Sequence, residues 1–166
     1  PFAAPLAYTG LGLLLVMNRM VPEDSPEWSY WVLLFALGGY VGNFVFSLTD
    51  HALNAFFHKT EWIPVISSAM AIGFLLMPLM MNVSRFYLRI CAAVMVGQGA
   101  VGLLGFYYHF VADWHGGEAT LFGNLVNGAP VLAPMLFADL MLLALLGLGT
   151  LSRQLPAAIL PTMQHG

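Results

Sequence analysis

Long apolar stretches separated by short polar turns make up most of the chain. A hydrocarbon core of about 30 Å requires roughly 20 apolar residues in a helix. Five stretches reach about that length: Phe2–Val21, Trp28–Thr49, Trp62–Met81, Phe86–Phe110 and Ala129–Leu151. Such spans must be helical, because lipid offers no partner for a free backbone N–H or C=O group. The pattern predicts an all-α, polytopic transmembrane bundle of about five helices with short loops, in a single domain over residues 1–166. The first stretch is the weakest of the five, because Pro1 and Pro5 crowd its start.

The composition excludes several classes of protein. Hydrophobic residues make up 60% of the 166 residues and charged residues only 8%, whereas a soluble domain carries about 25% charged residues. This excludes a soluble enzyme, a disordered chain and a disulfide scaffold. Five Lys plus Arg against eight Asp plus Glu provide no basic surface for nucleic acid. We therefore expect the chain to lie in the lipid bilayer. The composition does not indicate which reaction, if any, it catalyses.

The basic residues predict the orientation of the bundle. Successive spans alternate in direction, so the turns fall into two sets. Arg19, Arg85, Arg89 and Arg153 belong to one set, and Lys59 is the basic residue of the other. Because Lys and Arg mark the cytoplasmic side, the C-terminus is expected in the cytoplasm. The turns around residues 50–61 and 110–128 are expected on the extracytoplasmic side.

Histidines and carboxylates gather in these two outer turns. Four of the five histidines fall there together with four carboxylates: His51, His58, His109 and His115, with Asp50, Glu61, Asp113 and Glu118. If the second helix continues past the membrane, His51, Asn54 and His58 share one of its faces. His109 and Asp113 are one helical turn apart, and the two glycines after His115 are expected to end that helix.

This cluster suggests a transition-metal site. Imidazole suits Zn, Cu and Fe, and carboxylates complete the coordination shell or orient the histidines. The candidate ligands are Asp50, His51, His58, His109, Asp113 and His115, supported by Asn54, Glu61 and Glu118. The first hypothesis is thus a small membrane protein that binds a metal ion on its outer side, within a larger membrane complex. The simpler alternative is that these residues cap helix ends and bind lipid head groups.

A second hypothesis uses His51 and His109 as the two axial ligands of a haem between helices. Gly102 and Gly105 lie on the His109 face of the fourth span and could leave a groove for the macrocycle. The chain would then be a non-catalytic accessory subunit of a membrane redox or energy-transducing complex. Close helix packing through small residues explains the glycines equally simply.

Asp139 is the ionisable residue inside an expected span. At the bilayer centre a charged group costs about 2.5–3.5 kcal/mol, so Asp139 needs a role or a partner. It could accept protons, act as a ligand, or be a neutral acid bonded to Asn43 or Gln98. Pro130 and Pro134 precede it and should free backbone carbonyls near the outer face. A transporter that uses Asp139 is a third hypothesis, without support from an inverted repeat.

Overall fold

The structure, a computed structural model, describes residues 3–118 and 120–155, and within these residues it contains helices and no strand. The helices are α1 Ala3–Met20, α2 Pro26–Leu53, α3 Trp62–Met80, α4 Arg85–Trp114, α5 Leu121–Asn127 and α6 Leu136–Gln154. Two short 3₁₀ helices, η1 Lys59–Glu61 and η2 Ala133–Met135, precede α3 and α6. The expected all-α architecture is confirmed.

Four helical segments are long and apolar enough to cross a membrane: Pro26–Leu53, Lys59–Met80, Arg85–Trp114 and Ala133–Gln154. They correspond to the second to fifth expected spans. The first expected span does form a helix, α1, but α1 is not among the four. Asn18 and Arg19 in its last turn and Pro5 near its start lower its hydropathy. The expectation of about five spans is thus met by four helices and one shorter, more polar companion.

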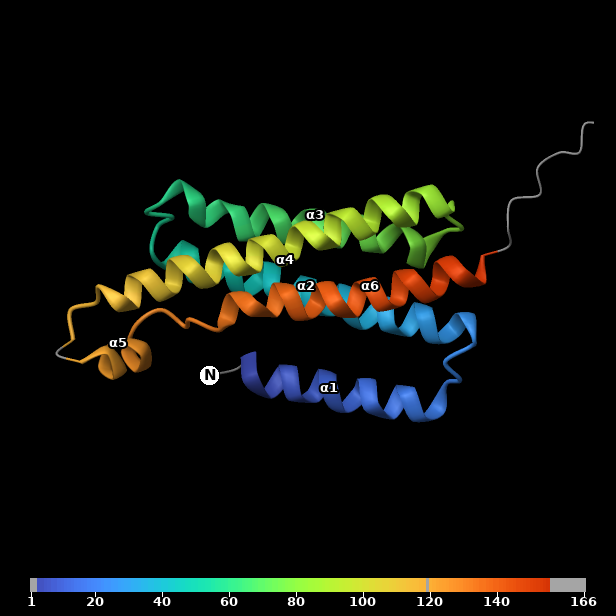
Figure 1. Cartoon of the computed structure of the whole chain (residues 1–166), viewed down its shortest axis with the longest axis horizontal. Coiled ribbons are helices and arrows are strands. Elements are labelled where there is room, and N and C mark those ends of the chain that lie inside the picture. Colours follow the sequence, from blue (N-terminus) through green and yellow to red (C-terminus); the bar gives the residue numbers. More distant parts are fainter. Residues whose placement is uncertain (1–2, 119, 156–166) are drawn as a thin grey trace, which may run out of the picture.

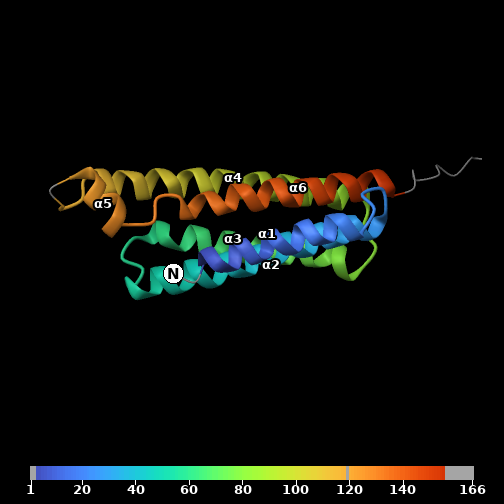
Figure 2. The same cartoon turned by 90° about the horizontal axis from the view of Figure 1, so that it is seen from below.

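The four long helices form an antiparallel bundle in two layers. Figure 1 shows them running side by side, and Figure 2 separates α4 and α6 from α2 and α3. Each helix packs on two neighbours, so that α2, α3, α4 and α6 close a ring. Among these elements α1 packs on α2 alone, and it lies beside the ring rather than within it.

Polar caps fix where the long helices begin. The Ser25 hydroxyl accepts a hydrogen bond from the Trp28 amide at 3.3 Å, and Ser84 does the same for Tyr87 at 3.2 Å. These bonds satisfy amides that have no partner inside a helix. Pro26 follows Ser25 at the first helical position, where its missing N–H costs nothing.

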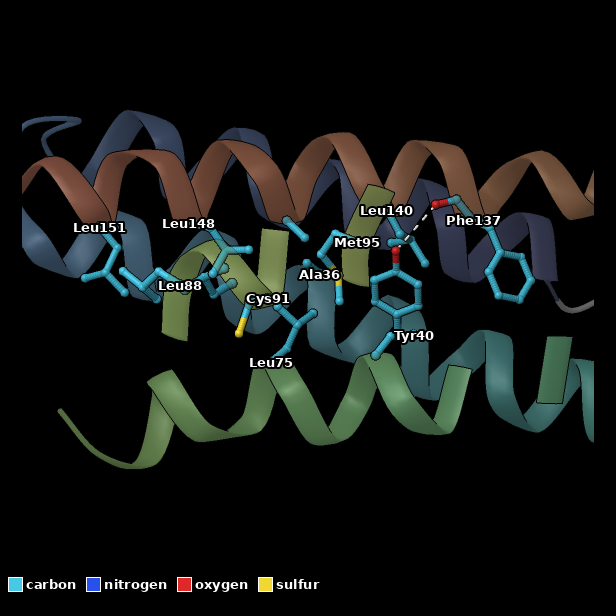
Figure 3. Close-up of a cluster of buried hydrophobic side chains, with 13 residues drawn as sticks. Ala36, Tyr40, Leu75, Leu88, Cys91, Met95, Phe137, Leu140, Leu148 and Leu151 are labelled. Carbon is cyan, nitrogen blue, oxygen red and sulfur yellow. Dashed lines mark hydrogen bonds between the residues drawn. The ribbon is translucent and has the colours of Figure 1, made fainter. Parts of the chain in front are cut away.

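The core runs along the axis of the bundle, where all four long helices meet (Figure 3). It contains Ala36, Tyr40, Leu75, Met95 and Leu148, each at most 2% exposed. Polar side chains inside the bundle find partners on neighbouring helices. The Tyr40 hydroxyl donates to the Phe137 carbonyl at 3.4 Å, and Ser67 donates to Gln98 at 2.5 Å. Such interhelical bonds fix the register of helices that share an apolar solvent.

The fifth span begins later than expected. Residues 129–132 are not helical, and α6 starts only at Leu136 after the short η2. Pro130 and Pro134 lack the N–H groups that a helix needs. The non-helical segment instead packs along the last turns of α4, where Gly102 and Gly105 allow Pro134 to approach. Glycine is needed there, because a Cβ on Gly102 would lie 2.8 Å from the Pro134 carbonyl oxygen.

We expect Gly102→Ala to destabilise the bundle by about 1–3 kcal/mol, because the added methyl group meets backbone that cannot rotate away. Gly97→Ala is the matched control on the same helix, since a Cβ at Gly97 meets nothing within 4 Å. The measurement is unfolding of the purified protein in mixed micelles by sodium dodecyl sulfate, followed by helical circular dichroism. Equal unfolding midpoints for the two variants would contradict the close approach of Pro134 to α4.

Candidate functional site

The C-terminal ends of α2 and α4 lie at the same end of the bundle, together with η1 and the 128–135 segment (Figure 1). We call this end, comprising residues 49–61 and 106–135, the polar end. It holds His51, His58, His109 and His115. The two outer turns of the sequence therefore meet, as the alternation of helices requires.

His51 and His58 are both connected to Glu61 of η1. The His51 Nδ1 atom lies 3.6 Å from Glu61 Oε2, an ion-pair distance, and the His51 side chain is 21% exposed. The other carboxylate oxygen, Oε1, accepts a hydrogen bond from the His58 amide at 3.2 Å. Glu61 Oε2 is buried and has no hydrogen-bond partner in the described part of the chain. The 3.6 Å separation from His51 Nδ1 is longer than a hydrogen bond, so this contact is an ion pair only when the imidazole is protonated.

His109 is oriented by the backbone of the non-helical segment. Its Nδ1 atom lies 3.2 Å from the Pro130 carbonyl oxygen. Because a carbonyl can only accept, this contact places the ring proton on Nδ1 and the free lone pair on Nε2. The Pro130 carbonyl also accepts a hydrogen bond from the Ala133 amide at 3.0 Å, so it is not the free carbonyl expected from the two prolines.

His51 and His109 lie at the same end of the bundle. The two imidazoles come from α2 and α4, which lie diagonally across the ring of four helices. Both residues are half-buried, and their contacts are to the adjacent elements, η1 for His51 and the 128–135 segment for His109.

His58 does not share a helical face with His51, contrary to the expectation from their spacing. The helix α2 ends at Leu53, and Ala55 and Phe56 adopt left-handed backbone conformations with φ of 55° and 50°. Stacking of Phe56 on Trp62, with ring centroids 4.0 Å apart, holds this otherwise unfavourable turn. His58 consequently lies beyond the turn, exposed and in edge contact with Phe57. Asn54 is the C-cap of α2 and is also exposed.

Asp113 fastens the loop that follows α4. Its carboxylate is 3% exposed, and Oδ1 accepts a hydrogen bond from the Ala129 amide at 3.0 Å. Oδ2 is buried without a hydrogen-bond partner among the described residues. Asp113 lines a cavity of about 260 Å³ together with Glu118, Asn124 and Asn127. In the structure Asp113 thus joins α4 to the start of the 128–135 segment.

His115 and Glu118 are exposed residues at the end of α4 and in the loop that follows it. His115 is the exposed C-cap of α4, which ends before Gly116 as the sequence predicted. The Glu118 side chain is exposed, and its amide donates to Asn124 at 2.9 Å. Asn124 was not singled out from the sequence, although Thr120 before it is a typical N-cap and reveals the short helix α5.

The six expected ligands do not form one metal centre. In residues 3–118 and 120–155, no group of three or more His, Cys, Asp or Glu side chains is placed to hold a metal ion. The left-handed turn separates His58 from His51, and the capping role of His115 leaves it exposed. The haem groove is absent at Gly102 and Gly105, because Pro134 fills the space beside both glycines.

Asp139 lies nearer the helix end than the sequence suggested. It is in the first turn of α6, where the positive end of the helix dipole favours a carboxylate. The expected bonds to Asn43 or Gln98 are not seen. The Asn43 Nδ2 atom is buried without a partner in the described chain, and the Gln98 carbonyl accepts from Ser67.

Comparison with known proteins assigns no family. No protein-family model matches the chain, and neither a curated protein nor a solved structure matches it. The functional argument therefore depends on the geometry of the polar end.

We expect Asp113→Ala to release the loop between α4 and α6, because it removes the acceptor of the Ala129 amide. Loss of a buried hydrogen bond costs about 1–3 kcal/mol, and the Ala129 amide should exchange its hydrogen at least about fivefold faster. Asp113→Asn keeps an oxygen at this position and should preserve protection. Glu118→Ala, at an exposed residue of the same loop, is the matched control. Hydrogen–deuterium exchange by mass spectrometry distinguishes the variants, and unchanged exchange in Asp113→Ala would refute the role of this bond.

Proposed function

We propose that this multi-pass membrane protein binds a transition-metal ion, Cu, Zn or Fe, through the Nε2 atoms of His51 and His109 at its polar end. This proposal reduces the expected set of six ligands to two histidines. Asp50, Glu61 and the other carboxylates of the polar end supply negative charge near the ion and do not form a preformed set of ligands.

The observation that carries the proposal is the orientation of His109 through Nδ1. Histidines that ligate metals donate their second ring N–H to a carboxylate or a backbone carbonyl, which fixes the tautomer and the direction of the ligating lone pair. The Nδ1 atom of His109 lies 3.2 Å from the Pro130 carbonyl oxygen, which leaves Nε2 for an ion. The second histidine, His51, lies with its Nδ1 atom 3.6 Å from the buried Oε2 atom of Glu61, a carboxylate that can orient the ring when an ion binds.

The charges around the pair favour a cation. Asp50, Glu61 and Asp113 belong to the same end of the bundle as the two histidines, and the buried Oε2 atom of Glu61 lies 3.6 Å from His51 Nδ1. A metal ion would supply positive charge near these carboxylates. Two protein ligands leave further coordination positions for water or for a group from another molecule. Such an open ion can act as a Lewis acid or can activate water.

The distribution of arginines supports an extracytoplasmic location of the polar end. The shortness of the loops supports membership in a larger complex. The haem alternative needs a site other than the face of Gly102 and Gly105, since Pro134 covers that face.

The test is equilibrium dialysis of the purified full chain against Zn²⁺ and, separately, Cu²⁺, with elemental analysis of the bound ion. We expect about one ion per chain and at least tenfold weaker binding in His51→Ala and in His109→Ala, because each variant removes a ligand. Glu61→Gln should weaken binding by about ten- to one-hundredfold through loss of His51 orientation.

The matched controls are His58→Ala and His115→Ala, which remove exposed histidines of the same end and should bind as the wild type does. Equal losses in all four histidine variants would indicate nonspecific surface binding and would overturn the proposal. Undiminished binding in the double variant His51→Ala, His109→Ala would overturn it as well. A Soret band in the natively purified protein that disappears in this double variant would replace the metal ion with haem.

A further inference from the structure

A groove between α1, α2 and α6 is separate from the polar end and has no part in the proposed metal site. Its volume is about 610 Å³. Leu14 and Met17 near the C-terminal end of α1, and Val21 just after it, pack on α2, while Thr9, Gly10 and Leu11 of α1 line the groove. Because α1 lies beside the ring of four helices (Figure 1), this groove lies within the membrane-spanning part of the molecule.

The floor of the groove is made of glycines on α2. Gly38 and Gly42 line it, and a Cβ at either position would meet nothing within 4 Å. Gly39 between them has a different role, because it touches Leu140 and allows α6 to pack closely. The open glycines are therefore not explained by helix packing, and they leave space for an elongated apolar molecule.

Thr9, Asn43 and Asp139 are the polar residues in this otherwise apolar lining. Asn43 is 6% exposed, and its Nδ2 donor has no hydrogen-bond partner in the described part of the chain. A buried donor without a partner is costly, so its presence beside a groove indicates a ligand that accepts. Asp139 lines the same groove from the first turn of α6 and is exposed. Its side-chain oxygens can accept a hydrogen bond from the same ligand.

We propose that this groove binds a membrane-dissolved lipid with an apolar chain and a hydroxyl head. The hydroxyl oxygen accepts from Asn43 Nδ2, and the hydroxyl hydrogen is donated to the Asp139 carboxylate. A ketone or ester carbonyl would satisfy Asn43 but would give Asp139 no donor. An ammonium group would satisfy Asp139 but cannot accept from Asn43, and an ionised fatty acid can accept from Asn43 but has no hydrogen to donate to Asp139.

The test uses the full chain in phosphatidylcholine vesicles with two photoactivatable probes. One is a long-chain primary alcohol with a diazirine on its chain, and the other is the alkane with the same chain and diazirine. Crosslinked peptides are identified by mass spectrometry. We expect the alcohol to label α1, α2 and α6 at the groove, whereas the alkane should label lipid-facing residues of all helices without this preference.

Filling the groove should remove the preference without disturbing the fold. Gly38→Leu and Gly42→Leu add side chains in open space, and Gly73→Leu is the matched control, because its Cβ also meets nothing within 4 Å but lies on α3, outside the groove. We expect the two groove variants to abolish preferential labelling and the control to retain it. Asn43→Leu should reduce the preference by about threefold, the typical effect of one hydrogen bond between groups in a membrane.

Several results would overturn the proposal. Equal labelling of the groove by the alcohol and the alkane would show that the polar pair recognises nothing. Undiminished labelling in the Gly38→Leu variant would place the alcohol elsewhere. Crosslinks between two copies of the chain through the groove would identify a second copy as its occupant. Because the histidines are unchanged in all these variants, the outcome does not depend on the metal-binding proposal.

Discussion

The requirement that every backbone polar group inside the bilayer find a partner determines this structure. Four long helices meet the requirement by themselves, and the 129–132 segment, which is not helical, meets it through side chains of α4 and through local bonds. Asp113 accepts from the Ala129 amide, and the Pro130 carbonyl accepts from the Ala133 amide and also contacts His109. One of the contacts of this irregular segment therefore also orients a histidine. The same constraint therefore explains both the late start of α6 and the preparation of the candidate site.

Much of the fold could be predicted from the sequence, because the length of an apolar run in a membrane has a single explanation. Four spans, their alternation and the meeting of two turns at one end follow from hydropathy alone. The ends of the helices were harder to predict from the sequence. Extrapolating the periodicity of α2 placed His58 beside His51, whereas two non-glycine residues, Ala55 and Phe56, take left-handed conformations. A ring stack with Trp62 holds that turn, and such a tertiary contact has no signal in local spacing.

The sequence predicted which types of residue gather at the candidate site, but not which of these residues could bind an ion. Histidines and carboxylates in the two turns indicated a cluster, but the sequence could not tell which side chains were already used by the fold. Asp113 fastens a loop, His115 caps a helix, and Glu61 serves both His51 and the His58 backbone. The proposed site uses the two half-buried imidazoles, His51 and His109. The glycines show the same division, since Gly102 serves packing while Gly38 and Gly42 border open space.

The central claim is that the fold prepares two imidazoles, one from α2 and one from α4, as ligands for one ion. Electron spin echo envelope modulation of the Cu²⁺-loaded protein tests it most directly, because the remote nitrogens of bound imidazoles produce a characteristic modulation that can be counted. The account predicts two imidazoles on one copper, with one remaining when either His51 or His109 is replaced. A spectrum with no bound imidazole, or one that still shows two after both replacements, would contradict the claim.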